Sequence, residues 1–144
     1  MAASARHTGA GRPWPQTLGL AFGAIYLLVG IVGFFITGFS GFASADHDAT
    51  LIVFDINPLH NIVHILIGVA GLALSRTLAG AKTFGLLLLV GYGAAFVYGL
   101  FATGRDWDIL NLNWADNILH ILSAAVGGAI YAGANKFAGR STRV

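Results

Sequence analysis

Two short stretches carry the residues that could do chemistry in this chain. Residues 57–64 read NPLHNIVH, and residues 113–120 read NWADNILH. Each stretch opens a strongly apolar segment, where a polar side chain without a partner is costly. Imidazole, carboxylate and carboxamide groups concentrated at these two places predict a polar site at the edge of a membrane.

The spacing of these polar residues suits metal coordination. His60 and His64 are four residues apart, and Asp116 and His120 repeat that spacing in the second stretch. Residues four apart lie on one face of a helix. Three imidazoles and one carboxylate would satisfy tetrahedral Zn²⁺, or a Cu²⁺ or Fe²⁺ ion with an open position. We therefore name a divalent metal site formed by these four residues as the first specific hypothesis.

The main alternative is that the polar residues are purely structural. Asn57 and Asn113 stand where helix caps are expected, and Asp116 would complete a capping box. Asn61 and Asn117, with the imidazoles, would then form hydrogen bonds across a helix interface in a membrane scaffold. This interpretation explains the caps better than it explains imidazole, since Ser or Thr could supply the same bonds.

Two further functions stay open on the same residues. His64 and His120 could be axial haem ligands from facing helices, although few basic or aromatic residues are placed to hold the rest of a haem. Alternatively, the histidines with Asp116 could relay protons or pass a small solute, although no charged residue lies deep in a span. No nucleotide loop, nucleophile elbow or HExxH motif is present. An enzyme is thus the less favoured class, with no catalytic residue to name.

Three other residues are weaker candidates. His47, between two aspartates, could capture a metal in a loop, though solvation is the simpler explanation. Tyr26 and Tyr92 could hydrogen-bond into the interior, though aromatic packing explains them as well.

Composition places the chain in a membrane. Of its 144 residues 56% are hydrophobic and 10% charged, with a mean hydropathy of +0.75. The apolar residues form four blocks of roughly 18–22, each long enough to cross a bilayer as a helix. We predict an all-α membrane protein, a four-transmembrane-helix bundle within residues 17–135. Its spans are about 17–37, 58–75, 83–103 and 114–134, and it lies between a flexible basic tail (1–16) and a second basic tail (136–144).

The first apolar block has a second interpretation. A basic start, an apolar run and the small residues Ala43-Ser44-Ala45 resemble a secretory signal with its cleavage site. The run is long for such a signal, and the internal repeat described below pairs it with a later span. We therefore treat it as a retained span.

Charge predicts the orientation. Seven of the eight Lys and Arg residues lie in the two tails and the turn 76–82, while all six carboxylates and Arg105 lie in or beside the loops between. The positive-inside rule then puts both termini in the cytoplasm and the two acidic loops on the outer side. The acidic mouth favours cations over anions. We expect the lipid bilayer as partner and no nucleic acid; the 20 glycines provide helix faces that could support homo- or hetero-oligomers.

The chain also matches itself. A shift of 56 residues aligns 57–71 with 113–127, and a shift of 66 aligns Tyr26, Gly33 and Thr37 with Tyr92, Gly99 and Thr103. We predict two parallel two-helix repeats, about 17–75 and 83–134, around a pseudo-twofold axis along the membrane normal. Each motif continues as a stripe of small residues, so we expect the second and fourth spans to face each other across a polar outer pocket.

The motif N-x-x-H-N-x-x-H followed by a glycine-spaced apolar helix resembles an uncharacterised family of small four-span bacterial membrane proteins. That family is known only as a domain of unknown function and is common in actinobacteria. The resemblance covers about residues 17–135, with full agreement at residues 57–64 and a departure at Asp116, where His would stand. It implies the fold and the location and carries over no activity.

Overall fold

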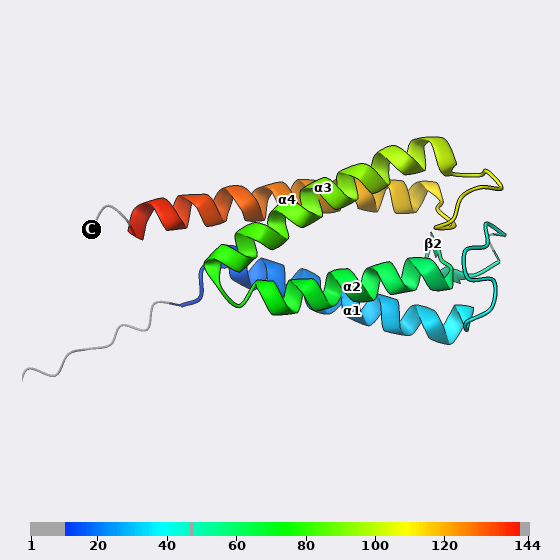
Figure 1. Cartoon of the computed structure of the whole chain (residues 1–144), viewed down its shortest axis with the longest axis horizontal. Helices are drawn as coiled ribbons and strands as arrows, with labels where there is room; N and C mark the ends of the chain where they lie inside the picture. The colour runs from blue at the N-terminus through cyan, green and yellow to red at the C-terminus, as the bar shows by residue number, and fades with distance from the viewer. Residues whose placement is uncertain (1–10, 47, 142–144) are drawn as a thin grey trace, which may run out of the picture.

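The computed structural model describes residues 11–46 and 48–141, which form four helices and one short hairpin. The helices lie side by side as an elongated bundle (Figure 1). His47 and parts of both predicted tails lie outside the described residues. The elements are α1 (Trp14–Thr37), β1 (Thr50–Leu51), β2 (Phe54–Asp55), α2 (Pro58–Leu74), α3 (Leu78–Ala102) and α4 (Trp114–Ser141), with β1 and β2 antiparallel.

Three of these helices are long and apolar enough to cross a membrane: α1, α3 and α4. The helix α2 has 17 residues and is also apolar. At about 1.5 Å per residue it extends about 26 Å, close to the shortest length that spans a bilayer. Large apolar side chains cover the outside of the bundle; Phe35, for example, is 85% exposed. A lipid environment accounts for such a surface, whereas water would not.

Glycines bring the helices together in two close pairs, α1 with α2 and α3 with α4, and the two pairs pack more loosely on each other. A Cβ atom added at Gly23 of α1 would lie 2.7 Å from the backbone nitrogen of Leu72. One added at Gly85 of α3 would lie 2.7 Å from the backbone nitrogen of Tyr131. Only glycine allows the backbones to approach this closely, as is common in membrane helix pairs.

This pairing differs from the expected interface between the second and fourth spans. In the described part of the chain, α2 and α4 share no close backbone contact. The small residues that continue the α2 motif instead pack on α1: a Cβ atom at Gly68 would overlap the backbone of Leu27, and one at Gly71 would lie 2.6 Å from Gly23 Cα. The small residues of α2 thus contact α1, the helix before it in the chain, because the α1 backbone can enter the groove that these glycines leave.

Each pair also contains the same polar contact. Asn61 of α2 donates its side-chain N–H to the Thr37 hydroxyl of α1 at 3.0 Å. Asn117 of α4 donates likewise to Thr103, which follows α3, at 3.0 Å. Gly33 and Gly99 make room for these amides, since a Cβ at either glycine would overlap the Asn side-chain oxygen.

Three helices extend beyond their expected limits: α1, α3 and α4. The helix α3 begins at Leu78 rather than near Thr83, because the Thr77 hydroxyl caps it by accepting from the Gly80 N–H at 3.0 Å. The basic segment 76–82 is therefore mostly helical. The helix α4 continues to Ser141, beyond the expected end near residue 134. At the other terminus, α1 begins at Trp14 with Pro15 in its first turn, where the missing N–H costs nothing.

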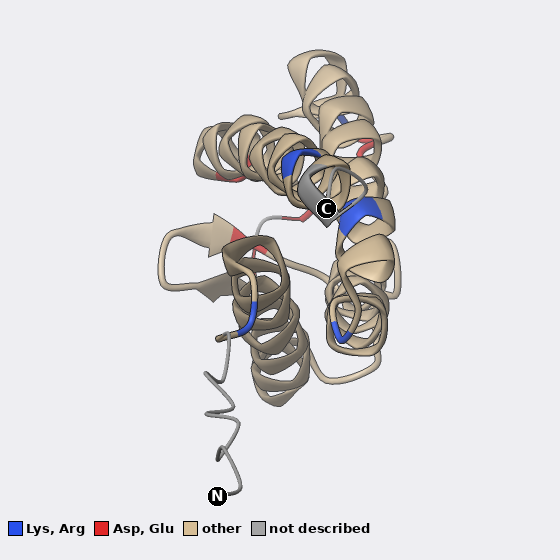
Figure 2. Ribbon diagram, turned by 90° about the vertical axis from the view of Figure 1, so that its left-hand side faces the viewer, with Lys and Arg blue, Asp and Glu red and all other residues tan. Residues whose placement is uncertain are grey.

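Basic residues gather at one end of the bundle. Arg12, Arg76, Lys82 and Lys136 lie where α1 begins, α2 turns into α3 and α4 approaches its end. Figure 2 looks along the bundle from this end. Here Gln16 donates to the carbonyl of Arg76 at 2.7 Å and ties the start of α1 to the end of α2. The hairpin and the α3–α4 loop, with the carboxylates, lie at the opposite end (Figure 1).

We predict that Gly33→Ala and Gly99→Ala each destabilise the bundle by about 1–3 kcal/mol, because the new methyl group must displace a buried amide that has its own partner. Thermal unfolding in detergent, followed by circular dichroism, measures the loss. Gly93→Ala is the matched control, since a Cβ there meets nothing within 4 Å. Equal stability of Gly33→Ala and Gly93→Ala would contradict the close contact.

Candidate functional site

The site begins with the cap of α2. Asn57 has an extended backbone, and its side-chain oxygen accepts from the His60 N–H at 2.9 Å. Pro58 follows in the first turn, where its fixed φ suits a helix. This cap fixes where α2 starts, and thereby places His60 and His64 on the first two turns, facing inward; both are buried.

The start of α4 carries a capping box. The Asp116 N–H donates to the Asn113 side chain at 3.1 Å, while the Asn113 N–H donates to Asp116 Oδ2 at 2.9 Å. These reciprocal bonds satisfy donors that a helix start otherwise leaves open. Asp116 is nevertheless only 2% exposed, so the carboxyl lies in the interior rather than at the surface.

The two cap residues also join the two helix pairs. Asn57 donates through Nδ2 to the carbonyl of Ile109, at 2.9 Å, and to that of Ser44, at 3.0 Å. Asn113 donates through Nδ2 to the carbonyl of Val53 at 2.9 Å. Val53 and Ile109 each stand four residues before a cap Asn, so the two bonds are reciprocal across the bundle. These hydrogen bonds thus hold the loop before α2 and the α3–α4 loop together over the site.

The α3–α4 loop has an internal frame built on Asp108. This buried side chain accepts from the N–H groups of Leu110 and Leu112, at 3.1 and 2.7 Å, and from the Tyr98 hydroxyl at 3.2 Å. The frame holds Asn111 at a φ of +57°, a conformation that Asn tolerates better than most residues. Asn111 in turn donates to the Ile56 carbonyl at 3.1 Å, a third bond between the two loops.

Beneath the loops, histidines and tyrosines form one buried cluster. Tyr26 of α1 and Tyr92 of α3 stack with ring centroids 5.2 Å apart. His64 lies 5.3 Å from the Tyr26 ring, and His120 lies 5.4 Å from the Tyr92 ring. The His60 ring is 4.4 Å from that of His64 and 6.2 Å from that of His120. All four helices therefore contribute a ring to this His/Tyr cluster.

The cluster leaves polar atoms unsatisfied. The Nδ1 atoms of His60, His64 and His120 are buried and have no hydrogen-bond partner within the described structure, and neither has the Tyr92 hydroxyl. By contrast, the Tyr26 hydroxyl pairs with the Ser123 hydroxyl at 2.5 Å. A buried polar atom without a partner costs about 1–3 kcal/mol. Buried polar atoms without a partner also occur outside the cluster, at the side-chain oxygens of Asn61 and Asn117 and at the Ser75 hydroxyl.

The candidate metal ligands come together only in part. His60, His64 and His120 share the cluster, but no group of three or more His, Cys, Asp or Glu residues in the described structure is arranged to hold a metal ion. Asp116, the expected fourth ligand, already accepts the Asn113 N–H. The remaining motif residues, Asn61 and Asn117, face α1 and α3 rather than the cluster.

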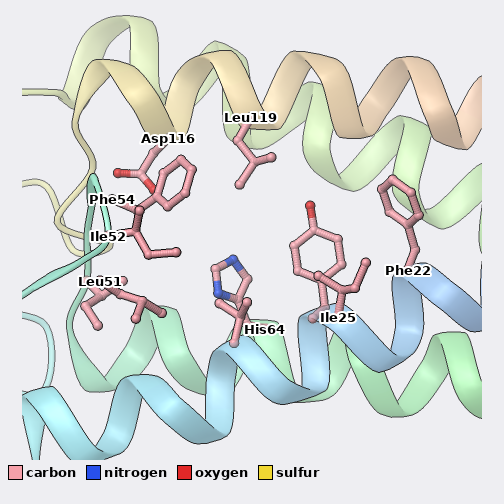
Figure 3. Close-up of a pocket in the computed structure, with 11 residues that line it drawn as sticks. Phe22, Ile25, Leu51, Ile52, Phe54, His64, Asp116 and Leu119 are labelled. Atoms are coloured by element: carbon pink, nitrogen blue, oxygen red, sulfur yellow. The ribbon is translucent and has the colours of Figure 1, made fainter.

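A cavity of about 320 Å³ adjoins the cluster between α1 and α4 (Figure 3). Residues 51–56, in and after the hairpin, cover one end of it. His64 and Asp116 also line it, but the surface that the cavity presents is apolar. In Figure 3 Asp116 lies at the hairpin end and Phe22 at the far end. The pocket therefore lies between the first and fourth helices, not between the second and fourth as expected.

Sequence reasoning ranked Tyr26 and Tyr92 low, yet they form the centre of the cluster. The shift of 66 residues that pairs Tyr26 with Tyr92 in the sequence was the signal that could have raised them. Asp108 and Ser123 were missed, because neither belongs to a repeated pattern. The apolar pocket wall gives no sequence signal that separates it from ordinary core.

Four helices, three of them able to span a membrane, around a buried polar cluster define a helical membrane protein. The chain belongs to the family described as a domain of unknown function, DUF4383, whose model matches residues 16–133. Both polar motifs and the whole pocket wall fall within this range. This confirms the predicted membership in an uncharacterised family. A search of curated proteins and a search of solved structures gave no match.

We predict that Asn57→Asp destabilises the protein by about 1–3 kcal/mol although it keeps the cap. The aspartate oxygen can still accept from the His60 N–H, but the carbonyls of Ser44 and Ile109 lose their donor and face an acceptor instead. Asn113→Asp is the comparison and should cost less, because its single cross-loop bond is exposed. Unfolding midpoints in detergent measure the loss of stability in both variants. An Asn57→Asp variant as stable as the wild type would show that the cross-loop bonds do not stabilise the protein.

Proposed function

We propose that this protein binds a small lipid-soluble molecule in the apolar cavity between α1 and α4, beside the His/Tyr cluster. One observation carries the proposal: a cavity of about 320 Å³ with an apolar surface lies between α1 and α4, next to the buried side chain of His64. Binding sites for small molecules commonly combine an apolar wall with a few polar groups.

Physical cost favours an occupied cavity over a merely structural one. Structural histidines satisfy their nitrogens, whereas His60, His64 and His120 each leave one open. Of these three side chains only that of His64 lines the cavity. The cavity lies between α1 and α4, in the looser contact between the helix pairs, so a ligand could enter from the bilayer without unfolding either close pair.

The same proposal includes the membrane arrangement. All four helices cross, with α2 at the lower limit of length and supported by its close pairing with α1. The basic end, with both chain ends, faces the cytoplasm, and the site lies near the outer face of a bacterial inner membrane. This orientation rests on the segregation of Lys and Arg to one end.

Duplication of a two-helix unit accounts for the paired contacts. Three observations support duplication: the Asn61–Thr37 and Asn117–Thr103 hydrogen bonds, the reciprocal bonds of the two cap residues, and the matched His–Tyr ring distances of 5.3 and 5.4 Å. Two parallel copies related by an axis along the membrane normal would place Tyr26 and Tyr92 against each other at that axis.

A second candidate function is binding of a divalent metal ion such as Zn²⁺, Cu²⁺ or Fe²⁺ by His60, His64 and His120, favoured by their three unpaired Nδ1 atoms. The rings would have to turn toward a common point. Asp116 would serve only by giving up its bond to Asn113.

Metal analysis of protein purified without a His tag tests the second candidate. Binding predicts one metal ion per chain, lost in His64→Ala and in His120→Ala but retained in Asp48→Asn, an exposed carboxylate in the loop before α2. Protein that stays metal-free after incubation with Zn²⁺, Cu²⁺ and Fe²⁺ excludes this candidate. An absorption spectrum with a Soret band would assign the histidines to haem instead.

Photolabelling tests the lipid-soluble ligand. We predict that a dodecanol carrying a diazirine in its chain labels the part of α1 that contains Phe22 and Tyr26, and that excess dodecanol suppresses this labelling. Leu119→Trp should abolish the suppressible fraction because indole fills the cavity. Leu122→Trp is the matched control, since Leu122 is 57% exposed on the same helix.

Labelling that excess dodecanol does not suppress would contradict the proposal, because contact with bulk lipid does not saturate. The cluster would then be a structural interface only.

A further inference from the structure

We infer that the basic end of the bundle binds an anionic phospholipid, with the phosphate beside Lys136 and an acyl chain in a groove between the start of α1 and the second half of α4. This site lies at the opposite end of the molecule from the hairpin and the loops, and it does not depend on the function proposed above. The groove has a volume of about 410 Å³ and is lined by Trp14, Ala129, Ala132, Gly133, Lys136 and Phe137.

A packing contact between α1 and α4 shapes this groove. The indole of Trp14, in the first turn of α1, packs on Gly133 of α4, where an added Cβ atom would overlap the ring. Trp14 and Phe137 are large and aromatic, whereas Ala129 and Ala132 have side chains of one methyl group. Large rings beside small residues leave a hollow with a mostly apolar surface. Such a surface suits a hydrocarbon chain.

The groove has one apolar end and one charged end. Ala129 and Lys136 are seven residues apart, so they lie on the same face of α4 and about 10 Å apart along its axis. Lys136 is exposed near the end of the bundle, and Ala129 lies closer to the middle. A phospholipid in the leaflet on this side has the same order, with its chain toward the bilayer centre and its phosphate at the interface. Trp14 is 46% exposed, as suits an indole at that interface.

Charge selects the head group. Four described cations lie at this end of the bundle (Figure 2): Arg12, Arg76, Lys82 and Lys136. The six carboxylate side chains of the chain lie at the opposite end, in the two loops or in the first turn of α4. No Asp or Glu of the protein is therefore near enough to neutralise these cations. An anionic lipid head supplies the missing negative charge, as it does for basic segments beside membrane helices.

Lys136 is the basic residue that lines the groove. Arg12 is exposed and stands two residues before Trp14, so it is the nearest cation along α1. Lys82 is engaged elsewhere, since its Nζ atom lies over the Tyr131 ring, 5.4 Å from the centroid. We therefore assign the phosphate to Lys136 and treat Arg12 as the second source of positive charge.

Other occupants match only part of this site. A second copy of the chain beside the groove would bring two basic ends together, and these would repel each other. A soluble polyanion would meet the charge but has no apolar part for the hollow between Trp14 and Ala129. An anionic phospholipid matches the apolar surface, the charge and their order along α4.

Trp14 lies in the groove and reports on its occupant. A variant with Trp107→Phe and Trp114→Phe, both at the opposite end, keeps Trp14 as its single tryptophan. This full-length protein is reconstituted in phosphatidylcholine vesicles that contain increasing fractions of phosphatidylglycerol or phosphatidylcholine brominated on the acyl chains. Bromine quenches indole fluorescence at contact, so the quenching curves give the relative affinity of the two lipids. We expect phosphatidylglycerol to bind about 5–30-fold more tightly, the effect of one to two cations at about 1 kcal/mol each.

Two pairs of variants in this background separate charge from shape. Lys136→Gln should lower the preference for phosphatidylglycerol about fivefold, whereas Arg105→Gln, an exposed cation at the opposite end, should leave it unchanged. Ala129→Phe fills the groove and should abolish the preference although it alters no charge. Ala125→Phe is its matched control, since Ala125 is exposed one turn away on α4 and does not line the groove.

Equal affinity for the two lipids overturns the inference. A preference that survives Ala129→Phe also overturns it, because anionic lipid would then gather around the charges without entering the groove. Quenching that decreases as the protein-to-lipid ratio rises would show that a second copy covers Trp14, which excludes the lipid as occupant.

Discussion

Hydrogen-bonding groups buried among apolar helices must find partners within the protein, and much of the half of this molecule that carries the loops is arranged to provide them. Water is absent from a bilayer core, so an unpaired group there is costly. Asparagine meets the need repeatedly: Asn57, Asn111 and Asn113 donate to carbonyls between the loops, and Asn61 and Asn117 donate to threonines within the helix pairs. Some buried atoms still have no partner in the described structure: the Nδ1 atoms of three histidines, the side-chain oxygens of Asn61 and Asn117, and the hydroxyls of Ser75 and Tyr92. The three histidines are neighbours in the His/Tyr cluster, beside the cavity in which we propose that a ligand binds.

The proposed duplication makes the differences between the halves informative. The cavity between α1 and α4 has a counterpart hollow of about 250 Å³ between α2 and α3, lined by Tyr92 and apolar residues but by no histidine or carboxyl. The first loop is longer and contains the hairpin that covers the cavity, whereas the α3–α4 loop has no such cover. Where the first half has His60, the second has Asp116, which lines the covered cavity. A symmetric frame thus supports a single asymmetric site.

Sequence reasoning reached the helices because apolar blocks, Asn-Pro at the start of α2 and the capping box of α4 are local features. It placed the start of α3 too late, since the Thr77 cap lies within a segment that its basic residues suggested was a turn. It also expected α2 to face α4. The stripe of Gly68 and Gly71 does indicate a close helix contact, but a stripe cannot specify which helix fills it, and α1 does. The cavity could not be predicted, because Phe22, Ile25 and Leu119 differ from other apolar residues only in what lies opposite them.

An experimental structure of the full chain, extracted from its own membrane into lipid nanodiscs, tests the central claim most directly. The account predicts four helices crossing the disc and an elongated density between α1 and α4 that ends beside His64 and Asp116. A closed cavity would contradict it, with Leu119 packed on Ile25 and the three imidazole nitrogens bonded to protein atoms.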